Sequence, residues 1–295
     1  MSGPVAKSVK TPLLEVAYEE SGPANGRPVL LLHGWPDDVR TWDAVAPELA
    51  ADGYRVLAPY LRGFGPTRFR DPGTMRSGQY TAVAQDAAGF LTAVGVSRAV
   101  VAGHDWGCRA GYVMAAAWPE RVERLVAISA GHDAIRDPSE LAPAQVRQYW
   151  YQWFLGHADG PKAFTKDRRA LCRELWRVWS PGWHFDAATF DRTAAAWDNP
   201  DWVAVTVQSY RHRWRAAPGD DRYADLEDLM GGPPTITVPT TVLHGADDGA
   251  SLPEGSAGQG HLFAGGYRRE VLPGVGHFVP RENPEAVLDA IRRTP

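Results

Sequence analysis

A glycine-flanked aspartate follows a short apolar run in the first half of the chain. Asp105 lies between Gly103 and Gly107, in the segment Ala99-Val-Val-Ala-Gly-His-Asp-Trp-Gly-Cys-Arg-Ala110. The glycines leave room for a tight turn from a strand into a helix, with one strained residue at its apex. A carboxylate with a pKa of about 3.9 is ionised at neutral pH and needs no activating base. We therefore predict that Asp105 attacks an electrophilic sp3 carbon and forms an alkyl ester; the alternative is an ordinary turn that Asp105 caps.

An acid and a histidine follow this aspartate in chain order. Asp247 and Asp248 come directly after the apolar run 240–243, where a carboxylate would lie at the C-terminal edge of a parallel sheet. His277 lies in the glycine-flanked loop Pro273-Gly-Val-Gly-His-Phe278. We predict that His277, oriented by one of the aspartates, activates the water that cleaves the ester. The alternatives are a loop histidine with a packing role, aspartates that cap their loop, and an acid located instead at Asp133.

A second tight segment supplies backbone donors. Leu32-His33-Gly34-Trp35-Pro36 follows a predicted strand. An ester intermediate needs N–H groups aimed at the oxygen that becomes negative during its hydrolysis. We predict that the amides of Trp35 and Trp106 form this oxyanion hole, and that the side chain of His33 is structural.

The elements that must position these residues alternate along the chain in the manner of parallel strands joined by helices. Strands are predicted at 29–32, 54–58, 99–102 and 125–128, and again within 235–243 and at 267–272. Helices are predicted at 45–49, 83–94 and 107–118, and a final helix that Asn283 caps and Pro284 begins.

Between the predicted strand at 125–128 and the next one, within 235–243, the residue pattern changes. Strand patterns are scarce in this stretch, arginines are frequent, and eight tryptophans crowd together: Trp150, Trp153, Trp176, Trp179, Trp183, Trp197, Trp202 and Trp214. Gly231-Gly-Pro-Pro234 is a candidate hinge back into the alternating pattern. We predict a core of residues 1–134 and 231–295 and a helical cap of residues 135–230.

Composition and charge limit the classes of molecule that this protein is expected to bind. A formal net charge of −4 over 295 residues provides no broad basic field for nucleic acid or anionic lipid. The histidines show no spacing typical of metal ligands, and the two cysteines, Cys108 and Cys172, are too few for a disulfide framework. No segment approaches the roughly 20 apolar residues that span a bilayer. We expect a cytoplasmic protein that acts on a small neutral molecule without metal or cofactor; its oligomeric state is left open.

Taken in order, the motifs HGWP, RGFG, GHDWG, LHGADD and GVGHF resemble the epoxide hydrolase and haloalkane dehalogenase branch of the α/β-hydrolase superfamily. The resemblance covers nearly the whole chain. It implies a mostly parallel eight-stranded sheet with helices on both faces and an inserted helical cap. The family's Gly-x-x-Asp pattern also favours Asp248 over Asp247 as the acid.

The cap distinguishes the two branches. Epoxide hydrolases resemble one another in presenting two cap tyrosines to the epoxide oxygen, and Tyr151 and Tyr210 lie in segments similar to theirs. A phenol hydrogen-bonds the strained oxygen and donates a proton as the alkoxide forms. Tyr149 competes with Tyr151, and aromatic packing is the alternative for both tyrosines.

Two other activities resemble this pattern less closely. Haloalkane dehalogenases hold the departing halide with indole N–H groups, a role open to Trp106. Fluoroacetate dehalogenases carry an arginine directly after the nucleophile, where this chain has Trp106, and Arg109 alone does not restore that pattern. We therefore predict an epoxide hydrolase that uses Asp105, Asp248, His277, Tyr151 and Tyr210. The alternatives are a haloalkane dehalogenase with the same nucleophile and a non-catalytic small-molecule binder.

Overall fold

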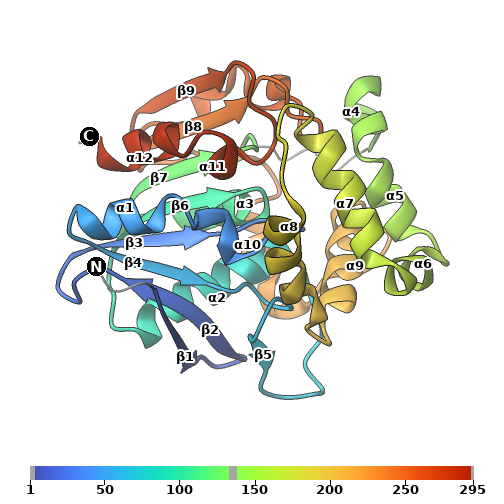
Figure 1. The fold of residues 1–295 in the computed structure, drawn as a ribbon, viewed down its shortest axis with the longest axis horizontal. Coiled ribbons are helices and arrows are strands. Elements are labelled where there is room, and N and C mark those ends of the chain that lie inside the picture. Colours follow the sequence, from blue (N-terminus) through green and yellow to red (C-terminus); the bar gives the residue numbers. More distant parts are fainter. Residues whose placement is uncertain (1–3, 133–137, 294–295) are drawn as a thin grey trace.

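The computed structural model describes residues 4–132 and 138–293, and one twisted sheet forms its centre (Figure 1). Within these residues eight strands follow one another in the order β1-β2-β4-β3-β6-β7-β8-β9, and a ninth, β5, pairs with β2 beside this path. β2 runs antiparallel to β1, β4 and β5, and the pairings from β4 to β9 are parallel. The strands are β1 (Val5–Lys10), β2 (Leu14–Ser21), β3 (Arg27–Leu32), β4 (Tyr54–Pro59), β5 (Arg68–Phe69), β6 (Ala99–His104), β7 (Val122–Ile128), β8 (Thr240–Gly245) and β9 (Tyr267–Leu272). The predicted mostly parallel, eight-stranded sheet is confirmed for the main path, and β5 is an addition to it.

Helices cover both faces of this sheet because successive strand residues point in opposite directions. Leu30 and Val101 pack in an apolar cluster with helices α2 (Tyr80–Ala93) and α3 (Trp106–Ala117). Their neighbours Val29 and Val100 pack in a second cluster, with α1 (Ala46–Ala51), α11 (Val279–Glu282) and α12 (Pro284–Arg292). The continuous apolar strands that the sequence shows are thus buried from both sides, as is typical of parallel sheets.

All the regular structure in residues 138–230, between β7 and β8, is helical. We call this segment the helical insertion, and Figure 1 shows its helices α4 to α9 gathered on the side toward which the parallel strands point. With α10, which follows them, the helices of this segment are α4 (Pro143–Gln148), α5 (Trp150–Gly156), α6 (Gly160–Lys166), α7 (Arg168–Trp179), α8 (Ala187–Ala194), α9 (Trp202–Arg213) and α10 (Ala224–Leu229). Short 3-10 turns lie at Val39–Trp42, Pro119–Arg121, Pro138–Glu140, Ala195–Asp198, Asp221–Tyr223, Pro253–Ser256 and Gln259–Leu262. None of the helices in the described residues is long and apolar enough to cross a bilayer.

The largest differences from the predicted strands lie at β8, β1 and β2. β8 begins only at Thr240, because Pro239 and the prolines before it lack the N–H that a strand ladder requires. Upstream, Ile236 makes only an isolated bridge to Phe263. β1 and β2 have no counterpart in the predicted strands; β1 is largely exposed and therefore carries no apolar run. The final helix begins as predicted, with the Asn283 side chain accepting a 3.1 Å hydrogen bond from the Ala286 amide.

Candidate active site

Asp105 forms the turn between β6 and α3 and has a positive φ. Its φ of 51° and ψ of −108° lie in a region that non-glycine residues seldom adopt. A Cβ atom on Gly34 would lie 2.6 Å from Asp105 Cβ, and one on Gly107 would lie 2.2 Å from the Leu32 carbonyl oxygen. Strain of this kind persists only where the surrounding structure enforces it. The glycines are therefore required by close backbone approach, which is the reason the sequence analysis gave for them.

One of the two predicted oxyanion donors contacts the Asp105 carboxylate. The Trp35 amide donates a 3.0 Å hydrogen bond to Asp105 Oδ1. Within the described chain, the Trp106 amide makes no hydrogen bond to this carboxylate. It belongs to the first residue of α3, where N–H groups have no intrahelical partner. The oxyanion hole serves an oxygen that forms only during the reaction, so this role stays a prediction for both amides.

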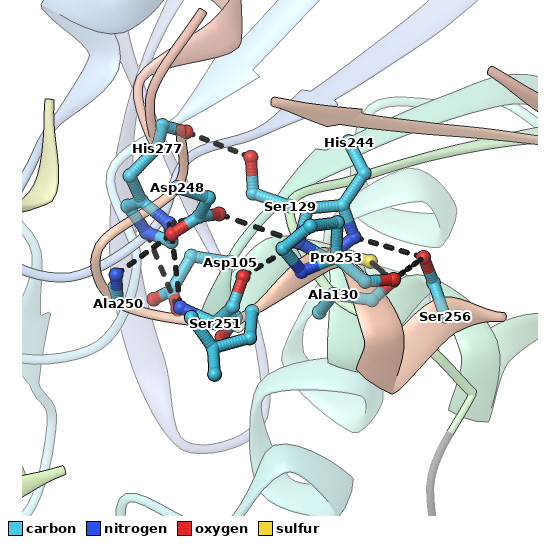
Figure 2. Close-up of polar contacts among 12 residues, drawn as sticks. Asp105, Ser129, Ala130, His244, Asp248, Ala250, Ser251, Pro253, Ser256 and His277 are labelled. Atoms are coloured by element: carbon cyan, nitrogen blue, oxygen red, sulfur yellow. Dashed lines mark hydrogen bonds and ion pairs between the residues drawn. The ribbon is translucent and has the colours of Figure 1, made fainter. Parts of the chain in front are cut away.

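His277 lies between Asp105 and Asp248 (Figure 2). Its Nδ1 atom lies 3.0 Å and 2.9 Å from the two carboxylate oxygens of Asp248, and its Nε2 atom lies 3.8 Å from Asp105 Oδ2. A carboxylate only accepts, so Nδ1 carries the proton and Nε2 presents a lone pair. Asp247 is exposed, and its amide donates to the Val275 carbonyl. The fold thus brings Asp248, and not Asp247, onto His277.

Electrostatics adapt this group to accept a proton. Burial works against a charge on His277, but the negative charge and hydrogen bond of Asp248 outweigh it and raise the pKa of His277 above its usual value. Burial likewise works to raise the pKa of Asp248, yet His277 and His244 hold that pKa well below its usual range. Asp248 is therefore ionised near neutral pH and stabilises the imidazolium that forms when His277 takes a proton.

The Asp248 carboxylate is itself fixed from behind. The amides of Ala250 and Ser251 donate to its Oδ1 atom at 2.8 Å and 2.9 Å, and His244 Nε2 lies 3.4 Å from Oδ2. His244 Nε2 also lies 2.7 Å from the Ser251 carbonyl oxygen. Both neighbours of Nε2 are acceptors, so this nitrogen carries a proton shared between them. Both oxygens of Asp248 are therefore held in place by groups other than His277.

The backbone of His277 is fastened equally firmly. The Ser129 hydroxyl donates to the His277 carbonyl at 2.7 Å, as Figure 2 shows, and His104 Nε2 donates to the same oxygen at 2.9 Å. The His277 amide donates to the Trp179 carbonyl at 3.0 Å. Burial lowers the pKa of His104 to about 4, so it is a neutral structural donor at neutral pH. These contacts fix the imidazole between its two carboxylates.

Tyr151 and Tyr210 come from α5 and α9 and meet over Trp35. Their ring centroids are 5.4 Å apart and nearly perpendicular. Tyr151 stacks parallel to Trp35 at 5.5 Å, while Tyr210 lies 5.3 Å from Trp35 and 5.8 Å from Trp106. Burial, with the nearby negative charge of Asp105, raises the pKa of both phenols well above the usual value. Both are therefore neutral hydrogen-bond donors; both rings pack on Trp35, and that of Tyr210 also packs on Trp106.

Tyr149, the competitor of Tyr151, has other partners. Its hydroxyl accepts a 3.5 Å hydrogen bond from Arg213, and its ring lies 5.8 Å from Trp214. In the part of the chain that the structure describes, no ring contact joins Tyr149 to Trp35 or Tyr210. Asp133, the further alternative for the acid, lies outside the described residues. The geometry favours Tyr151 as the partner of Tyr210.

The family model of the alpha/beta hydrolase fold matches residues 27–284, which span strands β3 to β9 and the helical insertion. This chain is an α/β-hydrolase. No group of three or more His, Cys, Asp or Glu side chains placed to hold a metal occurs in residues 4–132 and 138–293 of the hydrolase.

Relatives of this hydrolase include proteins named as epoxide hydrolases and as a haloalkane dehalogenase. A crystal structure of a Klebsiella pneumoniae protein, provisionally described as an epoxide hydrolase, is 38% identical with a TM-score of 0.91 and covers 97% of this chain and 95% of its own. Epoxide hydrolase A of Mycobacterium tuberculosis is 25% identical over 320 residues, which are 99% of this chain and 97% of its own length. A haloalkane dehalogenase of Mycobacterium marinum is 37% identical over 120 residues, only 39% of this chain and 38% of its own.

Sequence reasoning missed two supports of the hydrolase site. His244 was considered only as a metal ligand, although its spacing of four residues from Asp248 was a usable signal. Arg281 donates to both carboxylate oxygens of Asp37, at 2.8 Å and 2.5 Å; the Asp37 side chain is fully buried and that of Arg281 is 8% exposed. This ion pair ties the loop of Trp35 to the segment after His277. It joins residues 244 positions apart, and no local pattern indicated it.

Proposed function

We propose that this α/β-hydrolase is an epoxide hydrolase that converts an epoxide to a vicinal diol. The observation that carries the proposal is that three kinds of group lie close together: the carboxylate of Asp105, the imidazole of His277 and two neutral phenols over Trp35. The names of the relatives with full-length similarity support it. The partners required are a small-molecule epoxide and water.

In the first step Asp105 Oδ attacks a ring carbon of the epoxide. The new C–O ester bond forms as the ring C–O bond breaks, and the electron pair of the broken bond stays on the ring oxygen. Tyr151 and Tyr210 hydrogen-bond this oxygen, and one of them gives it a proton and becomes a tyrosinate. The raised pKa values of these phenols mean that their protons are present at neutral pH to be given.

In the second step His277 Nε2 takes a proton from water, and the resulting hydroxide attacks the ester carbonyl. The amides of Trp35 and Trp106 stabilise the oxyanion, and Asp248 stabilises the imidazolium. Collapse of the intermediate breaks the bond between the carbonyl carbon and the alkoxy oxygen. The departing alkoxide takes the proton of the added hydroxyl, which releases the diol and restores the Asp105 carboxylate. The imidazolium proton returns to the tyrosinate, so the net reaction consumes one epoxide and one water.

The organisation of the chain fits this cycle. We infer that residues 1–134 and 231–295 form the core and residues 135–230 form a cap that contributes Tyr151 and Tyr210. The cap encloses the reacting atoms in an aromatic environment, and water exclusion strengthens electrostatic interactions there. We also infer a cytoplasmic location, which suits the two buried free thiols of Cys108 and Cys172.

A haloalkane dehalogenase is the second candidate. The indole N–H groups of Trp106 and Trp179 are buried and have no hydrogen-bond partner within the described chain, so they are available to a halide. The two phenols argue against this candidate. A halide leaves without taking up a proton, so a dehalogenase would not need two neutral phenols as proton donors.

Parallel assays separate the two candidates. The enzyme is incubated with styrene oxide and, separately, with a bromoalkane of similar size, and diol and bromide are quantified. We expect diol from the epoxide at a rate far above that of bromide release. Bromide release faster than diol formation would replace the proposal with the dehalogenase. Neither product, from these and a panel of aliphatic epoxides, would contradict both.

A further inference from the structure

The hydroxyl of Tyr151 is contacted by the next residue in its own helix. Gln152 Nε2 lies 2.7 Å from the Tyr151 oxygen, and both side chains are buried. Successive residues on a helix point about 100° apart and do not normally face each other. This contact is therefore imposed by the surroundings of Gln152.

Those surroundings are the end of the other tyrosine helix. Trp214 directly follows α9, and its indole Nε1 lies 2.8 Å from Gln152 Oε1. The Trp214 amide also bonds the carbonyl of Tyr210 at 3.3 Å. The Trp214 ring is held in turn by Trp153, whose centroid is 4.6 Å away. One buried amide thus links the helices that carry Tyr151 and Tyr210.

The chemistry of the partners fixes the direction of each hydrogen bond. An indole N–H only donates, so the oxygen of the Gln152 amide must face Trp214. The NH2 group then faces Tyr151 and donates to its oxygen. The NH2 group of Gln152 therefore occupies an acceptor position of the Tyr151 hydroxyl, and an amide NH2 group cannot accept the phenolic proton.

Gln152 is the only hydrogen-bond partner of the Tyr151 hydroxyl within the described residues. The phenolic proton is consequently left for a group that enters the site. We propose that Gln152, oriented by the Trp214 indole, is a positioning residue that directs the proton of Tyr151 toward the substrate oxygen. This inference rests on the proposed function and deepens it: it identifies what makes Tyr151 a donor and not an acceptor.

A hydrogen bond received by the phenol also acts on its acidity. Burial and the charge of Asp105 raise the pKa of Tyr151, and the hydrogen bond from Gln152 works in the opposite direction. The same contact that orients the proton therefore eases its release during ring opening.

The decisive experiment is a double-mutant cycle on the first half-reaction. Alkylation of Asp105 by styrene oxide is followed by rapid quench and mass spectrometry in the parent, Gln152→Met, Tyr151→Phe and the double variant. Methionine keeps the length of the side chain and removes the donor. Two phenols that share an acid effect of ~10²- to 10⁴-fold account for about 10- to 100-fold each, so Gln152→Met should slow alkylation by up to that factor.

In the Tyr151→Phe background, Gln152→Met should change the rate by less than about twofold, because the proton it orients is gone. An equal slowing in both backgrounds would reduce Gln152 to a packing residue and overturn the inference. Hydrolysis of the ester, which depends on His277, should proceed at the parental rate in Gln152→Met.

Two further variants test the direction of the bonds. In Gln152→Glu an ionised carboxylate accepts the Tyr151 proton and diverts it from the substrate, whereas the protonated acid donates as glutamine does. Alkylation relative to the parent should therefore recover as the pH falls, and a parental rate at every pH would contradict the inference. Trp214→Phe keeps an aromatic ring but removes the indole N–H that orients Gln152, so it should slow alkylation; a parental rate would contradict the inference.

The outcomes distinguish a failure of the role proposed for Gln152 from a failure of the proposed epoxide hydrolase function. A parent that forms diol while Gln152→Met alkylates at the parental rate overturns the role of Gln152 alone. A parent that neither alkylates nor forms diol with any epoxide overturns the proposed function, and the inference with it.

Discussion

His277 Nε2 lies 3.8 Å from Asp105 Oδ2, beyond hydrogen-bond distance, and has no hydrogen-bond partner within the described residues. Nε2 of the neutral imidazole and Oδ2 of the carboxylate both present lone pairs, so neither donates to the other, and the carboxylate that must attack stays free. The Trp35 amide holds the other oxygen, Oδ1, at 3.0 Å. Asp105 is thus oriented by a backbone donor, and the base faces it without engaging it.

The two adjacent aspartates should differ sharply in their effect on ester hydrolysis. Asp248→Asn removes the carboxylate that orients His277 and stabilises its protonated form, a loss that in a comparable triad costs up to ~10⁴-fold. Asp247→Asn alters an exposed side chain and is the matched control, with a rate within about twofold of the parent. Single-turnover decay of the alkyl-enzyme measures both. Equal effects would move the acid elsewhere, with Asp133 the first residue to substitute.

The pH dependence of hydrolysis should report the raised pKa of His277. The imidazole must be neutral to take a proton from water, so hydrolysis falls as the pH drops through this pKa. Because Asp248 raises it, the midpoint should lie above the usual value of about 6.5. In Asp248→Asn the main opposition to burial is gone, and the midpoint of the residual activity should move to lower pH. An unchanged midpoint would mean that Asp248 does not set the charge of His277.

Ring opening should depend on the tyrosines in a partly redundant way. Tyr151→Phe and Tyr210→Phe should each slow alkylation by about 10- to 100-fold, and the double variant by ~10²- to 10⁴-fold. Decay of a preformed ester, which needs no phenol to leave, serves as the internal control. If the double variant opened epoxides at the parental rate, the phenols would be packing residues and the leaving oxygen would find its proton elsewhere.

The turn at Asp105 should tolerate no side chain at Gly107. In Gly107→Ala the new Cβ would lie 2.2 Å from the Leu32 carbonyl oxygen, and a backbone atom cannot rotate away. We expect a loss of ~1–3 kcal/mol or more in the free energy of unfolding, measured by urea denaturation. Gly89→Ala, in the interior of α2 with its nearest neighbour 4.0 Å away, is the control and should gain ~0.5–1 kcal/mol. A Gly107→Ala variant as stable as the parent would contradict the close approach.

The parts of the fold that the sequence predicted are those with a local physical signature. Strands buried on both faces need an unbroken apolar run, which marks 29–32 and 99–102. A strained turn needs glycines, which mark Asp105. β1 escaped prediction because its largely exposed residues, such as Ser8 and Lys10, follow no apolar pattern, and its place depends on pairing with β2.

The supports of the site depend instead on contacts between distant residues. The bond between Gln152 and Trp214 spans 62 positions and that between Asp37 and Arg281 spans 244. Neither partner carries a local mark of its role, since buried glutamine and arginine side chains look like surface residues in a sequence. The choice between Tyr149 and Tyr151 is of the same kind. Tyr149 lies in the turn between α4 and α5, and Tyr151 lies in the first turn of α5. They reach different partners because α5 packs against α9.

The central claim is that catalysis passes through an ester on Asp105. His277→Ala removes the base of the second step and leaves the nucleophile, so exposure to styrene oxide should trap the alkyl-enzyme. Peptide mass spectrometry should find the adduct, one styrene oxide mass, on Asp105, and one turnover of the parent in ¹⁸O-water should place the label in this carboxylate. An adduct on any other residue, or label that goes only into the diol, would contradict the account.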